Sequence, residues 1–350
     1  MMVEIKHTLC PSCSVGCGIS IISDADDVGT YPYKRHPVNE GKNCLNGRNS
    51  IDIYKNRIAK AIVSSSEADI DKAIESVVQG LKSKDNVTVI CSGNNTNDEI
   101  EAIKNFAEAQ NYNTVVLADN MGNCDEVASY DDVEAASKVF VIGDLLYENP
   151  LVGRRIVHAK QNGAAIVSNG LKEESVTFNI SNECSNVPVA EFLENIKGQL
   201  DDSSVIVVNY VDSYDDFAQI VDAAKSSNAK VLPMYSRPNT KGALNAVGAK
   251  SNDEIIEILS NTDVLLIFND DVVGEIDFDF KSISMVVSFA PCENETTSIS
   301  QIVIPIRSWL ECEGSFTNAM GSVQEFSPAV EICEDVLSEV EIIEKIQSEL

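Results

Sequence analysis

The sequence predicts an α/β protein in which a small cysteine-rich domain at the N-terminus precedes two doubly wound lobes built on parallel sheets. Three cysteines stand close together within the first seventeen residues, which is typical of a metal-binding loop. From about residue 68, short apolar strands alternate with amphipathic helices, and this alternation indicates parallel sheets covered by helices on both faces. With 350 residues, 44% of them apolar, the chain is long enough to bury two or three cores.

The composition excludes some classes of function. Fifty-five acidic residues against twenty-six basic ones give a net charge of −29, which repels phosphate backbones and argues against a nucleic-acid partner. The sequence contains no apolar run of eighteen residues and does not start like a secretion signal, so we expect no membrane span. Ten cysteines in such a chain indicate a reducing cytoplasm, and six of them have no ligand spacing.

The N-terminal motif is C-P-S-C-S-V-G-C-G, which contains Cys10, Cys13 and Cys17, and Cys44 opens a later C-L-N-G. Small residues between the first three cysteines allow a tight loop to turn its sulfurs inward, and a fourth thiolate from a later loop completes the ligand set of a 4Fe-4S cluster. A four-thiolate zinc site is the alternative, although zinc ribbons usually pair two CxxC units. We assign residues 1–58 to this cluster domain.

The rest of the chain follows an alternating pattern of helices and strands. Apolar positions at helical spacing predict helices, listed here in order: 70–81, 97–110, 150–162, 213–226, 252–260 and 336–346. Short apolar runs that end in turn residues predict the strands 86–93, 115–120, 136–143, 164–168, 205–209, 230–233, 264–268, 284–288 and 302–305.

Two stretches carry a family resemblance. The segments from Cys10 to Gly18 and from Arg35 to Gly47 resemble the cluster domain of molybdopterin oxidoreductases, especially the catalytic (alpha) subunit of the formate dehydrogenases of methanogenic archaea, and also the corresponding subunit of formylmethanofuran dehydrogenases. The segments Glu295 to Pro305 and Glu311 to Gln324 are similar to a second conserved pair of motifs in that family. The resemblance implies interleaved lobes: residues 59–125 with 203–330, residues 126–202, and a C-terminal helix in 331–350.

The resemblance also implies a molybdopterin guanine dinucleotide carrying Mo or W. Two loops at strand ends, Gly143 to Pro150 and Arg237 to Gly248, resemble cofactor-binding loops, because their glycines let the main chain approach a ligand. The cofactor-binding residues implied by the resemblance are Gly143, Asn149, Gly242, Asn245, Thr296, Thr317, Asn318, Gly321 and Gln324.

The sequence departs from the family at three places. The lysine that the family places between cluster and pterin is Asn46 here, and the family's E-G-R is Met320, Gly321 and Ser322. Where the family has a metal-ligating cysteine or selenocysteine followed by histidine, this chain offers only Cys124, for which an ordinary buried thiol is the alternative. These departures leave the catalytic activity of the chain open.

Two functions are consistent with the sequence. The first is an oxidoreductase subunit of formate dehydrogenase or formylmethanofuran dehydrogenase type that transfers electrons through one cluster; the alternative is a scaffold or assembly subunit that has lost the Mo or W chemistry.

The sequence ends without the family's C-terminal barrel, so we expect Ile304, Trp309 and Phe316 to be partly exposed. We therefore expect a hetero-oligomeric complex with an iron-sulfur or flavin subunit.

Overall fold

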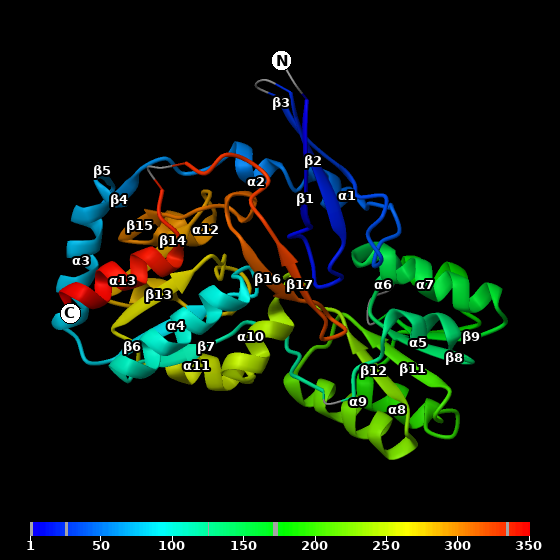
Figure 1. The fold of residues 1–350 in the computed structure, drawn as a ribbon. Helices are drawn as coiled ribbons and strands as arrows, with labels where there is room; N and C mark the ends of the chain where they lie inside the picture. The colour runs from blue at the N-terminus through cyan, green and yellow to red at the C-terminus, as the bar shows by residue number, and fades with distance from the viewer. Residues whose placement is uncertain (1–2, 25–26, 125, 171–173, 334–335) are drawn as a thin grey trace.

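The computed structural model describes residues 3–24, 27–124, 126–170, 174–333 and 336–350, and in it a small N-terminal sheet stands between two α/β lobes (Figure 1). The N-terminal sheet is antiparallel, in the order β1 (Glu4–Leu9), β2 (Gly18–Asp24), β3 (Asp27–Pro32). Two short helices follow it, α1 (Leu45–Asn49) and α2 (Asp52–Lys55). Ile19 and Ile21 of β2 are fully buried, so one face of this sheet belongs to a core that it shares with the second lobe.

The first lobe contains a seven-stranded sheet in the order β5-β4-β15-β14-β13-β6-β7, with a parallel arrangement from β15 to β7. Its strands are β4 (Ala61–Val63), β5 (Ser66–Ala68), β6 (Val87–Cys91), β7 (Asn113–Val115), β13 (Val264–Phe268), β14 (Met285–Ala290) and β15 (Ile302–Pro305). Its helices are α3 (Ile70–Lys82), α4 (Asn97–Gln110), α10 (Thr240–Val247), α11 (Asn252–Ser260), α12 (Glu295–Ile299) and α13 (Glu339–Glu349). The C-terminal helix α13 packs against α3 and α4, so the chain's last segment completes this lobe (Figure 1).

The second lobe contains a five-stranded parallel sheet in the order β10-β9-β8-β11-β12. Its strands are β8 (Lys138–Ile142), β9 (Ala165–Asn169), β10 (Glu183–Ser185), β11 (Ser204–Val208) and β12 (Lys230–Pro233). Its helices are α5 (Tyr130–Ala135), α6 (Leu145–Glu148), α7 (Pro150–Gln161), α8 (Val189–Ile196) and α9 (Tyr214–Ser227). Our sequence interpretation placed β11 and β12 in the first lobe, and this was wrong: β11 pairs with β8 along its whole length.

A two-stranded hairpin lies between the lobes beside the N-terminal sheet (Figure 1). It consists of β16 (Gly314–Thr317) and β17 (Val323–Phe326), joined by a turn in which Gly321 has a φ of 82°. A Cβ on Gly314 would lie less than 3 Å from the side chain of Thr96, the N-cap residue of α4. The hairpin therefore approaches the start of α4 closely. The hairpin therefore links the first lobe to the N-terminal domain.

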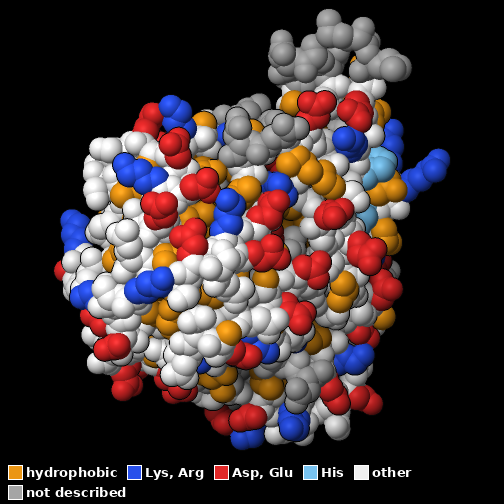
Figure 2. Space-filling view, turned by 60° about the vertical axis from the view of Figure 1, so that its left-hand side comes forward, with side chains coloured by type: hydrophobic (Ala, Val, Ile, Leu, Met, Phe, Trp, Pro, Cys, Tyr) orange, Lys and Arg blue, Asp and Glu red, His pale blue; other side chains and the backbone are white. Residues whose placement is uncertain are grey.

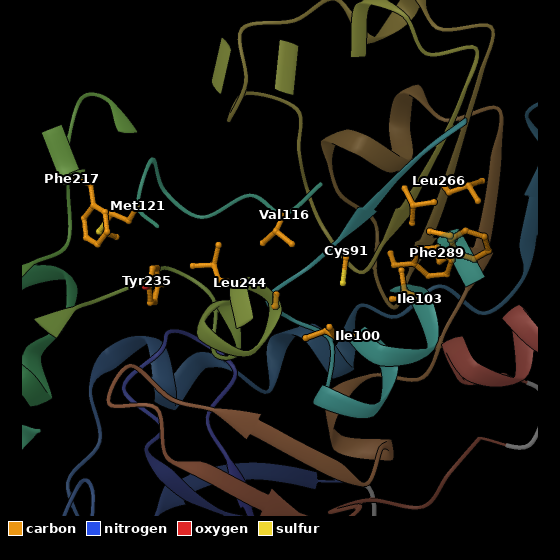
Figure 3. Close-up of a cluster of buried hydrophobic side chains, with 14 of the residues drawn as sticks. Cys91, Ile100, Ile103, Val116, Met121, Phe217, Tyr235, Leu244, Leu266 and Phe289 are labelled. Carbon is orange, nitrogen blue, oxygen red and sulfur yellow. The ribbon is translucent and has the colours of Figure 1, made fainter. Parts of the chain in front are cut away.

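The hydrophobic core is continuous from one lobe to the other. Figure 3 shows Leu266 and Phe289 of the seven-stranded sheet at one end, Val116 and Leu244 between, and Phe217 of α9 at the other end. Because the same buried cluster reaches both sheets, the two lobes cannot move apart without exposing apolar surface. This packing fixes the relative position of the loops at the strand ends.

Most helix and strand predictions are confirmed, and two local ones are corrected. The predicted helices 97–110 and 252–260 agree with α4 and α11, each of which begins with a capping box. The segment interpreted as a cofactor loop, residues 237–248, is instead mostly the helix α10, which starts after Asn239. The strand predicted at 115–120 is observed as β7 (Asn113–Val115), whose ladder with β6 ends at the pair Ile90–Val115, one residue before β6 itself ends.

The surface also corrects one expectation. Ile304, Trp309 and Phe316 are 0%, 7% and 2% exposed, so the apolar patch predicted around them does not exist; Trp309 packs in the core shared with the second lobe. Figure 2 shows acidic side chains scattered among basic and apolar ones over the visible face, which is the pattern of a solvated surface. Among the described residues, no helix has both the length and the apolar character needed to cross a bilayer.

Candidate functional site

The four motif cysteines surround one small cavity. Cys10, Cys13 and Cys17 lie in the loop between β1 and β2, and a hydrogen bond from Cys10 N to Cys17 O, at 2.8 Å, closes that loop. Cys44 arrives from the other side as the N-cap residue of α1, where its sulfur accepts a hydrogen bond from Gly47 N. All four line the same cavity, together with Val15, Asn43, Asn149, Pro150 and Leu151.

Groups from both lobes hold the cysteine loop in place. Ser14 N donates to Tyr235 O, and Tyr235 N donates back to Ser14 Oγ at 2.8 Å. The Tyr130 hydroxyl donates to Val15 O at 2.8 Å, and the indole nitrogen of Trp309 donates to Leu9 O at 3.0 Å. Because these partners come from well-packed elements, the loop is positioned before any cofactor binds.

Glycine is required where the loop meets the β16–β17 hairpin. Gly16 has a φ of 75°, and a Cβ on it would lie 2.0 Å from Gln324 Oε1 and 2.9 Å from Asn318 Cβ. Gln324 Nε2 donates to Gly16 O at 3.0 Å, and Asn318 Nδ2 donates to Gln324 Oε1 at 3.0 Å. Gly18 is similarly restricted, because a Cβ there would overlap the ring of His36.

The thiols are in an environment that disfavours their anions unless a metal compensates the charge. Burial raises the pKa of Cys13 to about 12, and the neighbouring thiols Cys10 and Cys44 add to the shift. Burial likewise raises the pKa of Cys10 and of Cys17. Iron ions would reverse these shifts by neutralising the thiolates, so cluster binding and proton release are coupled at this site.

Both metal alternatives use four thiolates. A tetrahedral zinc site needs four sulfurs at about 2.3 Å from one ion, and a 4Fe-4S cluster is also held by four cysteine thiolates. The four thiols around the cavity supply this ligand set.

A second, larger cavity of about 530 Å³ lies at the carboxyl ends of the second lobe's strands. Gly143 follows β8, Gly170 follows β9, Asn209 follows β11, and Ser236 lies in the loop after β12; all four line the cavity. The chain leaves β8 towards β9 on one side of the sheet and leaves β11 towards β12 on the other. The cavity therefore lies at the topological switch point, where parallel α/β sheets usually bind ligands.

The lining of this cavity suits the hydrogen-bonding parts of a pterin nucleotide. Asn209 Oδ1 and Ser175 Oγ are buried there and have no hydrogen-bond partner among the described residues, so each is available to a ligand. Gly143, with a φ of 99°, lets the main chain approach the cavity. The described lining residues are neutral or acidic, so among them phosphate groups would depend on backbone N–H donors. Asp119 and Asp144 already accept hydrogen bonds from neighbouring backbone N–H groups.

The two cavities share a wall. Cys13 and Asn149 line both of them, and Asn46, which stands where the family has a lysine, lines the larger one. Burial is the main cause of the raised pKa of Cys13, and the nearby Asn149 side chain acts in the opposite direction. A cofactor in the larger cavity would thus be separated from the cluster by the wall that contains Cys13 and Asn149. The lysine that the family places between cluster and pterin is replaced by Asn46 in this wall region.

The residues implied by the resemblance fall into three groups. Gly143 and Asn149 line the larger cavity. A second group forms contacts within the protein. Gln324 is hydrogen-bonded to Gly16 of the cysteine loop and to Asn318. Thr317 N donates to Asn239 Oδ1, Gly242 is buried beside Asn239, and the Thr296 hydroxyl donates to Asp271. The third group, Asn245 and Gly321, is exposed. For the second and third groups, contact with the cofactor stays a prediction.

Cys124 occupies a core position. It is 6% exposed and belongs to the hydrophobic cluster that joins the lobes. This burial is typical of a structural thiol and adds no support to the role of metal ligand. Sequence analysis missed the cavity residues Asn209, Ser175 and Tyr210, although Asn209 is the last residue of a predicted strand, and ligand-binding residues are expected at such strand ends.

Comparison with known proteins gives the family. Residues 3–56 match the molybdopterin oxidoreductase Fe4S4 domain, and residues 68–349 match the molybdopterin oxidoreductase family. The chain is 24% identical to F420-dependent formate dehydrogenase 2 subunit alpha of Methanococcus maripaludis in an alignment 485 residues long. This alignment covers all of this chain and 71% of the relative. A second relative, F420-dependent formate dehydrogenase 1 subunit alpha of the same organism, is 31% identical over 48% of this chain and 28% of its own length.

Solved structures share the fold. Acetylene hydratase from Pelobacter acetylenicus superposes with a TM-score of 0.70 at 12% identity, over 98% of this chain and 69% of that one. The formyltransferase/hydrolase complex FhcABCD from Methylorubrum extorquens matches with a TM-score of 0.56 at 12% identity, over 82% of this chain and 98% of that one. The two domain matches support a 4Fe-4S cluster and a molybdopterin cofactor. The chain therefore belongs to the molybdopterin oxidoreductase family and carries that family's N-terminal Fe4S4 domain.

Proposed function

We propose that this chain is the cluster- and pterin-binding subunit of an oxidoreductase of formate dehydrogenase type. The observation that carries the proposal is the wall shared by the two cavities, because electron transfer requires the two redox centres to be close together. The names of the relatives, which are alpha subunits of formate dehydrogenases, support formate as the substrate class.

In this proposal the four cysteines are the cluster ligands, and Gly143, Ser175 and Asn209 meet the pterin nucleotide. The bound molybdopterin supplies a redox metal that exchanges electrons with the substrate. The protein's own contribution is position: the cysteine loop is held from both lobes, and Asn209 Oδ1 offers an acceptor to a ring N–H. Thr317, Asn318 and Gln324 act at a distance, by holding the cysteine loop against the hairpin.

A partner is part of the proposal. Leu45 and Tyr147 are 70% and 68% exposed, and both line a shallow pocket beside Cys44. Exposed apolar side chains next to a redox centre favour an interface, and we propose that an iron-sulfur or flavin subunit docks there. The names of the relatives are those of subunits and of a complex, which agrees with a hetero-oligomeric assembly. None of the ten cysteines, all of which lie in the described residues, forms a disulfide; this agrees with a reducing compartment, and we propose the cytoplasm for the complex.

Metal analysis of anaerobically purified protein tests the proposal. We expect about four iron and four sulfide per chain, together with Mo or W. Replacing any of Cys10, Cys13, Cys17 and Cys44 by Ser should abolish the cluster absorbance, whereas Cys184→Ser, which changes an exposed thiol, should keep it. Stoichiometric zinc without iron would refute the cluster, and iron without Mo or W would assign the chain to the alternative role of a non-catalytic scaffold.

A further inference from the structure

The side chain of Asn149 lies at the boundary between the cluster cavity and the larger cavity. It is 4% exposed and lines both of them, as Cys13 also does. Asn149 precedes α7, but its side chain makes no capping hydrogen bond to that helix. Its buried amide is therefore not explained by helix capping, which is the usual role of an asparagine at this position.

The orientation of the Asn149 amide is fixed by a second asparagine. Asn209 Nδ2 donates to Asn149 Oδ1 at 2.9 Å, so the Asn149 oxygen faces Asn209 and its Nδ2 is left to donate elsewhere. The Asn149 amide lines the cluster cavity together with Cys13, whose sulfur can serve as the acceptor for its Nδ2. Asn209 Oδ1 in turn is buried beside Gly143 and has no hydrogen-bond partner among the described residues. The result is a chain of amides that runs from the larger cavity to a cluster cysteine.

We propose that Asn149 is a positioning residue that donates a hydrogen bond to the sulfur of Cys13 and thereby sets the reduction potential of the cluster, with Asn209 holding its amide in that orientation. The inference rests on the proposed function, because it requires the cluster to be bound at these cysteines. It assigns a role to the neutral side chain that separates the two cavities.

The physical reason is the charge of the reduced cluster. Adding one electron increases the negative charge on the cluster sulfurs, and an N–H donor stabilises that charge more than it stabilises the oxidised form. The wall around Asn149 is buried, and a hydrogen bond is stronger in such a low-dielectric place than in water. Removing the donor therefore lowers the reduction potential.

Potentiometric titration of the full chain, followed by electron paramagnetic resonance of the reduced cluster, tests this proposal. In Asn149→Ala we expect the equilibrium constant for reduction to fall about tenfold, which is about 59 mV for a one-electron couple. Asn209→Ala should shift the potential in the same direction by less, because Asn149 stays but loses its anchor. The control is Asn162→Ala, an exposed asparagine at the other end of α7, which should leave the potential unchanged.

The outcomes separate the inference from the function on which it rests. If the wild-type protein holds no iron-sulfur cluster, the proposed function fails. If Asn149→Ala and Asn209→Ala keep the full iron content but also the wild-type potential, the inference fails and the proposed function stands. If Asn149→Ala loses its iron, Asn209→Ala decides: an unchanged potential in that variant overturns the proposal, and a lowered one supports it.

Discussion

Replacing Gly16 by Ala should destabilise the cluster domain by more than backbone strain alone explains. An alanine at a φ of 75° costs about 1–2 kcal/mol, because the left-handed region is unfavourable for a residue with a Cβ. The new Cβ would also lie 2.0 Å from Gln324 Oε1, so Gln324 must move away. That movement breaks its hydrogen bonds to Gly16 O and Asn318, which are worth about 1 kcal/mol each. The expected total loss of unfolding free energy is about 3–4 kcal/mol.

Gly321→Ala provides the matched control. Gly321 has a φ of 82° and no heavy atom within 4 Å of a built Cβ, so this variant has the strain without the collision and should lose only about 1–2 kcal/mol. Anaerobic urea unfolding can be followed by the fluorescence of Trp309, the chain's single tryptophan, which is bonded to Leu9 next to the cysteine loop. Equal losses in the two variants would refute the reasoning, because the contact between loop and hairpin would then contribute nothing.

Three further substitutions test charged and ionisable groups in the first lobe. Asp270→Asn should cost about 3–5 kcal/mol, because it leaves the buried guanidinium of Arg237 without its buried carboxylate partner. Glu275→Gln, at a half-exposed partner of the same guanidinium, should cost about 1 kcal/mol or less. Similar losses for the two variants in a urea titration would contradict this. Burial and the neighbouring Glu99 raise the pKa of Glu339 well above its ordinary value of 4.5, so the folded state keeps a proton that the unfolded state releases and stability falls as pH rises above about 4.5. Glu339→Gln imitates the protonated acid and should remove this part of the decline in stability. It should therefore raise the melting temperature more at pH 8 than at pH 5. An equal change in melting temperature at the two pH values would show that Glu339 is ionised in the folded protein.

Sequence reasoning was most reliable where the information is local. Four cysteines at a characteristic spacing predicted the cluster site, and short apolar runs predicted β12, β13 and β15 with their observed bounds. Helix starts were also well placed, since capping residues such as Thr96 and Ser251 act within one turn.

The errors concern interactions between segments distant in sequence. The apolar run of β11 fits either sheet, and only its pairing with β8 decides which one contains it. Trp309 and Phe316 were expected to be exposed because the sequence does not reveal that the cysteine loop and β17 cover them. The segment 237–248 contains two glycines and two asparagines, which suggested a loop, but burial of Leu244 and Ala243 makes most of it the helix α10.

The larger cavity was only partly predictable. Gly143 and Asn149 could be chosen from their position after a predicted strand, and the same rule would have found Asn209. Ser175 gives no such signal, because it lies in a segment without a predicted strand and reaches the cavity only through the tertiary fold.

The closeness of the two redox centres is the central claim, and electron paramagnetic resonance of the native protein tests it most directly. In a partly reduced sample we predict a Mo(V) or W(V) signal that becomes broadened or split when the cluster is reduced, because Cys13 and Asn149 alone would separate the two spins. A Mo or W signal that does not respond to the reduction state of the cluster would contradict the claim that the larger cavity holds the pterin beside the cluster.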